Sequence, residues 1–366
     1  MSPARDLGWM EMAYGLAEKA RGRTSPNPHV GAVVVRDGTV VGHGFHEEPG
    51  KPHAEILALG LAGRRAKGAT LYLTLEPCVH WGRTPPCVDT VLAAGLARIV
   101  VSAIDPNPLV RTKGIRRLEQ GGIDVSVGCL AERNAALNEA YAKFITRRVP
   151  FVTLKAALTL DGKIASRTGA SKWISSPGTR DYVHLLRGEH DALMIGANTL
   201  VADDPLLTVR HAAWPAKRII RAVLDSRLRF PLTSRMLSTL DRGRILVFAG
   251  REAPADKARA LEALGVEVLL PPDGAPAWSL ARVLAELGRL EIAALLVEGG
   301  SRLFTSFIED GLADKAVLTL APLLVGGAAA PGFIAGAGVD TIAGAVALKR
   351  WRSFTIEDDI IAEGYF

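Results

Sequence analysis

Three short segments in the first quarter of the 366-residue chain carry residues that could bind a metal and move protons. They are His-Ala-Glu with His53 and Glu55, Glu-Pro-Cys with Cys78, and Pro-Pro-Cys with Cys87. One imidazole and two thiolates suit Zn²⁺, and three protein ligands leave a fourth position for water, as in catalytic sites. Zinc lowers the pKa of that water toward about 7. A carboxylate such as Glu55 can then carry the proton, so the set predicts hydrolytic deamination of a ring carbon.

The spacing of the two cysteines narrows the kind of deaminase. The H-x-E…P-C…C order resembles the cytidine deaminase superfamily, whose common signature is C-x-x-C. Here eight residues, VHWGRTPP, separate Cys78 from Cys87. We expect this wider loop to bring His80 and Arg83 to an anionic substrate. The wide spacing also argues against the deaminases that act on nucleic acids.

The residues alone also allow interpretations in which they have no catalytic role. The cysteines could be buried small residues or part of a purely structural zinc site, but both leave Glu55 unexplained. His80 could be a fourth ligand, although it lies only two residues from Cys78. For Cys129, between an expected strand and an expected helix, we favour a buried thiol.

Short strands and helices in alternation must position these segments. The Asp37-Gly38 pair predicts a hairpin between two apolar strands. Cys87 falls in the first turn of a predicted helix, where the helix dipole favours a thiolate. The pattern predicts helices over 6–20, 53–63, 85–95 and 131–145, a strand over 70–78, and further strands at ARIVVSAIDPN and IDVSVG. Such alternation is typical of a three-layer α/β/α domain.

The alternation restarts after the RRVP joint at 147–150, which predicts two α/β domains, 1–148 and 149–366. Three cysteines exclude a disulfide framework. No apolar run approaches the roughly 20 residues of a membrane helix, and no signal-peptide stretch is present, so we expect a cytoplasmic protein that does not bind membranes.

The charge distribution bears on the partners. The net charge is +6, and residues 1–148 supply +5 of it, from 19 basic and 14 acidic residues. No basic run exceeds a pair, so a nucleic-acid-binding stripe is not expected. A small phosphorylated substrate suits this charge better.

Longer motifs resemble the bacterial bifunctional riboflavin biosynthesis proteins, in which a deaminase is fused to a reductase. The first half carries TSPNPHVGAVVV, PHAE and TLEPCVHWGRTPPC. The second half carries TLDGKIA, SKWISSP, GANTLVADDPLLTVR and VEGGSRLF. The resemblance spans almost the whole chain, with Val79 in place of a common serine and Trp81 at a variable, often aromatic site.

The resemblance implies a cytidine deaminase-like domain followed by a dihydrofolate reductase-like α/β domain. The first would deaminate 2,5-diamino-6-ribosylamino-4(3H)-pyrimidinone 5′-phosphate, and the second would reduce the ribosyl side chain to ribityl with NADPH. It implies His53, Cys78 and Cys87 as zinc ligands, Glu55 as the proton carrier and Asn27 in the substrate pocket. Related enzymes form homo-oligomers, so we expect one here.

In the second half the resemblance also implies two sets of contacts. The residues alone predict less, because no G-x-G-x-x-G follows a strand. The glycines of VEGG could form a phosphate-binding turn or an ordinary tight turn. The implied cofactor contacts are Ala157, Trp173, Thr199, Asp203, Ser226 and Gly300, and the implied substrate contacts are Ser171, Arg187, Leu207, Arg210 and Glu298.

Physical chemistry is consistent with these assignments. Arg187 and Arg210 could grip the substrate phosphate, or could be solvated surface charges. Glu298 could bind ribose hydroxyls, and the role of Lys163 stays open. The competing hypothesis is a nucleobase or tRNA deaminase whose second domain only binds nucleic acid.

Overall fold

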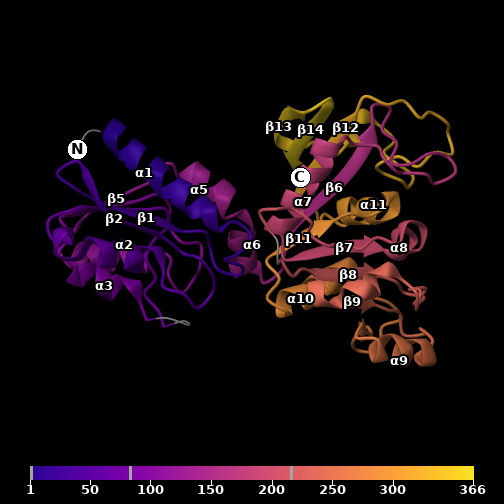
Figure 1. Cartoon of the computed structure of the whole chain (residues 1–366), viewed down its shortest axis with the longest axis horizontal. Helices are drawn as coiled ribbons and strands as arrows, with labels where there is room; N and C mark the ends of the chain where they lie inside the picture. Colours follow the sequence, from indigo (N-terminus) through magenta and orange to yellow (C-terminus); the bar gives the residue numbers. More distant parts are fainter. Residues whose placement is uncertain (1–2, 82–84, 215–216) are drawn as a thin grey trace. The chain divides into compact units, whose positions relative to one another are not determined.

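The structure is a computed structural model that describes residues 3–81, 85–214 and 217–366. The chain divides into two compact units, Met1–Arg148 and Val149–Phe366. Both units combine helices with one sheet (Figure 1). Each unit is described by itself below.

The first unit is built on a five-stranded sheet in the order β2-β1-β3-β4-β5. β1 pairs antiparallel with β2 and β3, while β3, β4 and β5 run parallel. The strands are β1 (Gly31–Arg36), β2 (Thr39–Phe45), β3 (Thr70–Leu73), β4 (Arg98–Val101) and β5 (Asp124–Val127). The helices are α1 (Pro3–Ala17), η1 (Glu18–Ala20), α2 (Ala54–Ala62), η2 (Gly63–Ala66), α3 (Cys87–Ala93), α4 (Lys113–Gln120), α5 (Ala131–Leu137) and α6 (Glu139–Arg147).

Alternating apolar side chains give this sheet two buried faces. In β1, Ala32 and Val34 pack with α2, α3 and α4, while Val33 and Val35 pack with α1 and α5. Strand side chains alternate between faces, so a continuous apolar run in a short strand requires cover on both sides. The unit is therefore the three-layer α/β/α domain that the sequence predicted.

Two glycines in β2 let α2 approach the sheet closely. A Cβ at Gly42 would lie 2.1 Å from the backbone oxygen of Ala58, and one at Gly44 would lie 2.6 Å from the Cβ of Leu57. The close approach fixes the position of the N-terminal end of α2, which carries His53 and Glu55.

The second unit is built on a nine-stranded sheet in the order β10-β9-β8-β7-β11-β6-β12-β14-β13. The strands from β10 to β12 are parallel, and β14 and β13 are added antiparallel. The strands are β6 (Phe151–Thr159), β7 (Ala192–Gly196), β8 (Ile220–Leu224), β9 (Ile245–Phe248), β10 (Glu267–Leu269), β11 (Ala294–Val297), β12 (Lys315–Ala321), β13 (Lys349–Ile356) and β14 (Asp359–Tyr365). The helices are α7 (Pro177–Glu189), α8 (Ala197–Asp203), η3 (Arg235–Arg242), α9 (Ala255–Ala263), α10 (Leu280–Arg289), α11 (Ser301–Glu309) and η4 (Ile342–Gly344).

Helices cover both faces of the parallel part of this sheet. In β7, Leu193 and Ile195 face a core that includes residues of α7, α8, η3 and α9. Ala192 and Met194 face the opposite core, to which α10 and α11 contribute. In such open α/β sheets, ligands bind outside the carboxyl ends of the strands.

Several elements differ from the sequence expectations. The strand predicted over 70–78 ends at Leu73, and helix α4 was not predicted. The helix predicted over 131–145 breaks at Asn138, whose side chain accepts from the backbone N–H of His29 at 2.7 Å and donates to its carbonyl at 3.1 Å. Side-chain bonds of this kind compete with helix continuation. Within the described residues, no helix is long and apolar enough to cross a membrane.

Candidate functional site

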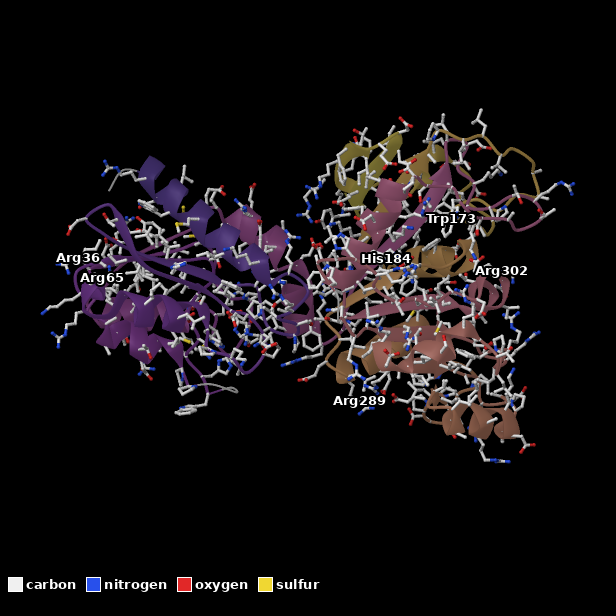
Figure 2. All side chains as sticks on the ribbon, viewed as in Figure 1. Arg36, Arg65, Trp173, His184, Arg289 and Arg302 are labelled. Carbon is white, nitrogen blue, oxygen red and sulfur yellow. The ribbon has the colours of Figure 1, made fainter. Side chains whose placement is uncertain are left out.

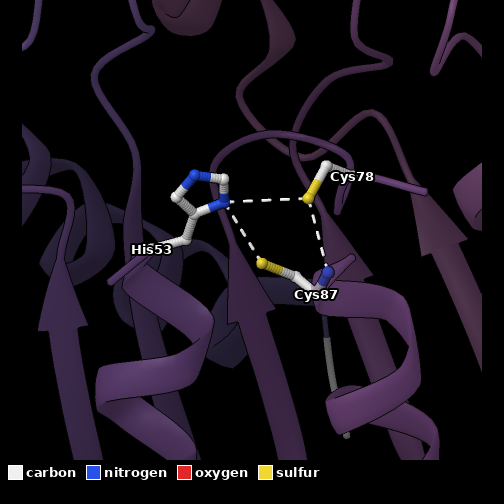
Figure 3. A group of neighbouring side chains, drawn as sticks. All are labelled: His53, Cys78 and Cys87. Carbon is white, nitrogen blue, oxygen red and sulfur yellow. Dashed lines mark hydrogen bonds between the residues drawn. The ribbon is translucent and has the colours of Figure 1, made fainter. Parts of the chain in front are cut away.

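The predicted zinc ligands converge in the first unit. The Nδ1 atom of His53 lies 3.1 Å from the Sγ of Cys87 and 3.7 Å from the Sγ of Cys78, and all three ligand atoms lie within 4.8 Å of one another (Figure 3). Zinc bonds of about 2.0–2.3 Å in tetrahedral geometry place ligand atoms about 3.5 Å apart. The donor set and its spacing therefore fit a zinc ion.

Two of the proposed ligands stand at the start of a helix, and the third lies in the loop after β3. His53 is the N-cap residue of α2, and Cys87 is the first residue of α3. Cys78 follows β3, and its Sγ accepts from the backbone N–H of Cys87 at 3.3 Å. The hydrogen bond between the two thiols, together with His53, lowers the pKa of Cys78, while the same bond and burial raise the pKa of Cys87. A thiolate is the form that binds a metal.

The segment before Cys78 is anchored by a buried carboxylate. Glu76 is 4% exposed and accepts backbone N–H groups of Asp105, Thr112, Gly114 and Ile115 at 2.9–3.2 Å. Gly114 and Ile115 lie in the first turn of α4, whose unpaired N–H groups favour a negative charge. Glu76 thus ties the cysteine segment to α4.

Glu55 lies in the first turn of α2 and is 3% exposed. Burial raises the pKa of its carboxyl group. A carboxylate with a raised pKa takes up a proton more readily than an ordinary carboxylate, as a general base must. Glu55 has the position and the chemistry of a proton carrier beside the ligand cluster.

Asn27 is connected to the ligand cluster through a histidine that the sequence did not single out. The Nδ2 atom of Asn27 lies 3.0 Å from the Nε2 atom of His46, whose ring packs edge-on against that of His53 at 5.1 Å. No sequence motif marks His46. The His80 ring is half-buried, and its Nδ1 atom has no hydrogen-bond partner within the described residues. Arg83, expected at the substrate, lies outside the described residues.

A second acidic group near this site was also missed. Asp105 is 5% exposed and accepts from the Tyr141 hydroxyl at 2.9 Å and from the backbone N–H of Asn107 at 2.8 Å. Burial raises its pKa to about 6. The signal available in the sequence was the Asp-Pro-Asn-Pro run that follows β4.

The second unit contains a cavity of 1520 Å³. This volume exceeds the roughly 300–1,000 Å³ of a site for one small ligand, so it fits two ligands side by side. Trp173, His184 and Arg302 line it from different segments of this unit (Figure 2). Predicted contacts that line it are Ala157, Ser171, Trp173, Arg187, Thr199, Asp203, Arg210, Ser226, Glu298 and Gly300.

Leu207 differs from the other predicted contacts. Its side chain is 3% exposed and packs in the core on the α7 side of the sheet, and it is not among the lining residues described. The backbone at Leu207 has a φ of +47°, which side chains rarely adopt. Leu207 therefore shapes the loop beside the cavity from within the core.

An ion pair lies in the cavity wall. Arg187 donates to both carboxylate oxygens of Glu298, through Nε at 2.5 Å and Nη2 at 2.9 Å, and its Nη1 donates to the carbonyl of Thr208. Although burial opposes ionisation, Arg187 lowers the pKa of Glu298 to about 2, with help from Lys155. The Arg187 guanidinium is thus engaged with Glu298, which the sequence could not show.

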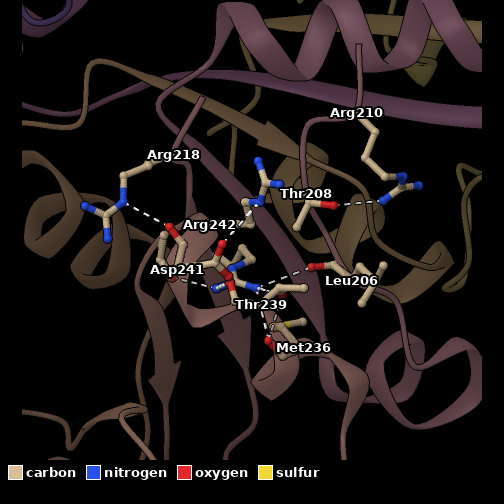
Figure 4. A network of polar contacts seen from close by, with 10 residues as sticks. Leu206, Thr208, Arg210, Arg218, Met236, Thr239, Asp241 and Arg242 are labelled. Atoms are coloured by element: carbon tan, nitrogen blue, oxygen red, sulfur yellow. Dashed lines mark hydrogen bonds and ion pairs between the residues drawn. The ribbon is translucent and has the colours of Figure 1, made fainter. Parts of the chain in front are cut away.

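Arg210 is more accessible to a ligand than Arg187 is. It is exposed, and its Nη1 donates to the Oγ1 atom of Thr208 at 2.8 Å (Figure 4). The buried Arg221 holds the neighbouring backbone through the carbonyls of Leu206 and Met236 and the side chain of Thr239. Arg210 therefore projects from a loop whose backbone is fixed from inside the core.

Two further contacts join residues in other parts of the cavity wall. The Ser171 hydroxyl donates to Asp203 at 3.4 Å, and the guanidinium of Arg180 lies 4.7 Å from the centre of the Trp173 ring. Gly300 and Thr199 follow the neighbouring strands β11 and β7, and a Cβ added at Gly300 would lie 3.7 Å from the Oγ1 atom of Thr199. Gly300 is the N-cap of α11, so its turn can bind a phosphate of a nucleotide.

The fold and the two sites define a class: an α/β/α domain with a deaminase-type zinc site, joined to a second α/β domain whose cavity can hold a nucleotide. Family comparisons agree with this division. Residues 3–103 match the cytidine and deoxycytidylate deaminase zinc-binding region, and residues 150–362 match the RibD C-terminal domain. The chain therefore belongs to the RibD family of bifunctional riboflavin biosynthesis proteins.

Relatives match along nearly the whole length. The riboflavin biosynthesis protein RibD of Aquifex aeolicus is 43% identical, with 97% of both chains covered, and that of Bacillus amyloliquefaciens is 41% identical, with 91% of this chain and 89% of the relative covered. The solved structure of Acinetobacter baumannii RibD, form 1, has a TM-score of 0.87 at 34% identity and covers 100% of this chain and 99% of its own. A Thermotoga maritima deaminase/reductase structure has a TM-score of 0.86 at 33% identity, with 99% of both chains covered.

These findings confirm several sequence predictions. The chain is an enzyme with a deaminase and a reductase half, and the expected fold class and family are correct. The zinc-binding region and the reductase family make zinc and NADPH its cofactors. The competing hypothesis, a deaminase with a non-enzymatic nucleic-acid-binding second domain, is not supported, because the second half belongs to a reductase family.

Proposed function

We propose that residues 1–148 deaminate 2,5-diamino-6-ribosylamino-4(3H)-pyrimidinone 5′-phosphate and that residues 149–366 reduce the ribosyl side chain of the product. The proposal rests chiefly on the convergence of His53, Cys78 and Cys87 beside the buried Glu55. The Thermotoga maritima structure, similar over 99% of both chains, is described as a deaminase and reductase of the corresponding phosphoribosylaminopyrimidines.

In the deaminase half, this chain's residues bind the metal and move protons. His53, Cys78 and Cys87 hold zinc, which when bound acidifies a water molecule. As water adds to the ring carbon, the Glu55 carboxylate would accept one proton and deliver it to the neighbouring ring nitrogen. It would then transfer the second proton of that water to the amino group, which leaves as ammonia when the C–N bond breaks. Asn27, together with His80 and Arg83, contributes to substrate binding.

In the reductase half, the residues position two ligands against each other. NADPH, when bound, supplies the hydride. Ala157, Trp173, Thr199, Asp203, Ser226 and Gly300 contact the cofactor, Ser171 and Arg210 contact the substrate, and the buried Leu207 shapes the loop before Arg210. Glu298, held ionised by Arg187, faces the cavity as an acceptor for ribose hydroxyls. Holding the sugar carbon close to the nicotinamide supplies much of the catalysis.

We also propose a homo-oligomer in the cytoplasm. Apolar side chains are exposed around β13, including Ile342 at 90%, Trp351 at 65% and Val346 at 59%. Contiguous exposed apolar surface marks interaction sites, and we propose that these residues form one. The need for two thiolate ligands suits a reducing compartment. Sedimentation equilibrium of the purified chain checks the oligomeric state.

A coupled assay tests the proposed function. The purified chain is given the diaminopyrimidine substrate with and without NADPH, and the products are separated by chromatography. We expect ammonia release in both cases, a deaminated ribosyl intermediate without NADPH, and the ribityl product with it. Failure to consume the substrate would overturn the proposal.

A substitution at Glu55 tests the role of this residue in the deamination step. Glu55→Gln should lower the rate of deamination by about 10²–10⁴-fold, because it removes the proton carrier. Zinc content should be unchanged, since the ligands remain. Glu119→Gln, at an exposed position of α4, is the control. Full deamination by Glu55→Gln would remove Glu55 from the mechanism.

A further inference from the structure

Three strand ends meet along one edge of the cavity in the second unit. β8, β7 and β11 are consecutive neighbours in the parallel sheet. Their carboxyl ends lead to Ser226, Thr199 and Gly300, respectively, and all three residues line the cavity. A ligand that follows this edge passes from the glycine turn, across the start of α8, to the loop after β8.

The expected position of the substrate determines in which direction the cofactor lies along this edge. β6, which carries Lys155 and Ala157, neighbours β11 on the side opposite β7. Glu298, at the end of β11, is electrostatically coupled to Lys155 on β6, so we place the substrate sugar that Glu298 binds at these two neighbouring strands. The nicotinamide must meet the substrate there, and the glycine turn suits the pyrophosphate. The adenosine of the cofactor therefore extends past β7 toward β8.

The segment after β8 carries two exposed arginines and one buried acid, Asp225, and all three residues line the cavity. The carboxylate of Asp225 is 1% exposed, and its Oδ2 atom accepts from the backbone N–H of Phe230 at 2.8 Å. Arg227 and Arg229 are exposed and line the cavity. An acid at such a strand end binds the ribose 2′-hydroxyl of NAD, whereas an arginine accommodates the 2′-phosphate of NADP. Because Asp225 is buried and bonded to the backbone while both arginines are exposed, a ligand in the cavity meets the second arrangement.

Arg229 is held in place for this role. Its Nη2 atom donates to the Oδ1 atom of Asn198 at 2.7 Å, next to the predicted cofactor contact Thr199. Its Nε atom lies 3.9 Å from Asp225, which offsets the nearby negative charge, and its side chain is 48% exposed. The guanidinium is therefore anchored on one side while it remains open to a ligand.

We propose that Arg229, with Arg227 beside it, binds the 2′-phosphate on the adenosine ribose and so determines the preference for NADPH over NADH. The proposal rests on the reductase function proposed for this unit. NADPH and NADH differ only in this phosphate. Substituting a residue that binds the phosphate should therefore change the affinity for NADPH and leave the affinity for NADH unchanged. A guanidinium is suited to a phosphate because it can donate two parallel hydrogen bonds.

The test measures binding without turnover. The full chain is titrated in a calorimeter with 2′,5′-ADP, which carries the 2′-phosphate, and with 5′-AMP, which lacks it. We expect Arg229→Gln to weaken 2′,5′-ADP binding by about 10- to 100-fold, the effect of losing hydrogen bonds to a charged group. Binding of 5′-AMP should change by less than about 3-fold. Arg229→Lys should weaken 2′,5′-ADP binding to an intermediate extent, because lysine keeps the positive charge but lacks the paired N–H donors of the guanidinium.

The control and a second readout keep the test specific. Arg289→Gln removes the same charge from α10, outside the described lining of the cavity, and should leave both titrations unchanged (Figure 2). In steady-state assays the ratio of kcat/KM for NADPH to that for NADH should fall in Arg229→Gln. Equal losses for 2′,5′-ADP and 5′-AMP would place Arg229 at a shared phosphate and overturn the proposal, as would no loss for either. A wild-type chain that binds 2′,5′-ADP but reduces nothing would instead count against the proposed function.

Discussion

At the level of single residues, the Arg187–Glu298 pair places two opposite charges in direct contact in the cavity wall. Both side chains are nearly buried, at 13% and 12% exposure, and two hydrogen bonds join them. Removing one partner of such a pair leaves the other charge without compensation, which costs more than the net contribution of the intact pair. The pair therefore fixes the geometry of the substrate side rather than adding much net stability.

We predict that Glu298→Gln destabilises the second unit by about 3 kcal/mol at pH 7. The pKa of Glu298 is about 2 in the folded chain and below its ordinary value of 4.5. A lowered pKa contributes stability above the unfolded-state pKa, and this contribution disappears as the pH falls from about 5 toward 2. The difference between wild type and variant should therefore shrink over this range, measured by urea unfolding of the full chain.

Glu267→Gln provides the matched comparison. Glu267 also pairs with an arginine, Arg244, but the two side chains are 42% and 47% exposed. Exposed pairs contribute about 0–1 kcal/mol because water screens them. If Glu298→Gln destabilised the chain no more than Glu267→Gln does, or by the same amount at every pH, the buried pair would not have the assigned electrostatic role.

The sequence could predict those site residues whose side-chain type indicates their role, but not those whose role depends on distant neighbours. His53, Cys78 and Cys87 were identifiable because metal ligands need particular side chains in a particular order. His46 and Glu76 were not, because their roles depend on neighbours from distant segments: Asn27 in one case and the start of α4 in the other. The engagement of Arg187 with Glu298 likewise depends on two segments that are 111 residues apart.

At the level of elements, the packing of α2 on β2 determines where His53 and Glu55 lie. Gly42 has no room for a side chain, since a Cβ there would lie 2.1 Å from the Ala58 carbonyl oxygen. Backbone atoms cannot move aside as a flexible side chain can. A larger residue must push the helix off the sheet and carry His53 with it.

We predict that Gly42→Val lowers the zinc content of the purified chain and the rate of deamination at least 10-fold, with a destabilisation of about 1–3 kcal/mol from overpacking. Zinc is measured by atomic absorption, and stability by thermal unfolding. Gly60→Ala is the control in α2 itself. A Cβ at Gly60 meets no atom within 4 Å, so alanine should stabilise the helix by about 0.5–1 kcal/mol. Normal zinc binding by a folded Gly42→Val variant would contradict the prediction.

Elements with strong local signals were predicted correctly, and those set by tertiary contacts were not. The Asp37-Gly38 turn, with both residues at positive φ, joins β1 and β2 as the sequence indicated. Helix α4 was missed because its sequence, KGIRRLEQ, is mostly polar, and its first turn is capped by Glu76 from another segment. The break at Asn138 depends on bonds to His29, which no local pattern reveals.

At the level of the whole molecule, the two chemistries use separate parts of the chain. The proposed zinc ligands and Glu55 fall within Met1–Arg148, and the lining residues described for the cavity fall within Val149–Phe366. Each unit has its own sheet and its own hydrophobic cores. Damage to one site should therefore leave the other site intact.

Metal removal tests this independence. Treatment with a zinc chelator should reduce deamination by more than about 100-fold, because zinc is what makes water reactive at neutral pH. Reduction of the separately prepared deaminated intermediate by NADPH should stay within about 2-fold of the untreated rate. Adding zinc back should restore deamination, which distinguishes loss of metal from unfolding. A parallel loss of both activities would show that the metal also stabilises the reductase unit. Such a loss would contradict the separation of the two sites, because no residue of the zinc cluster belongs to the second unit.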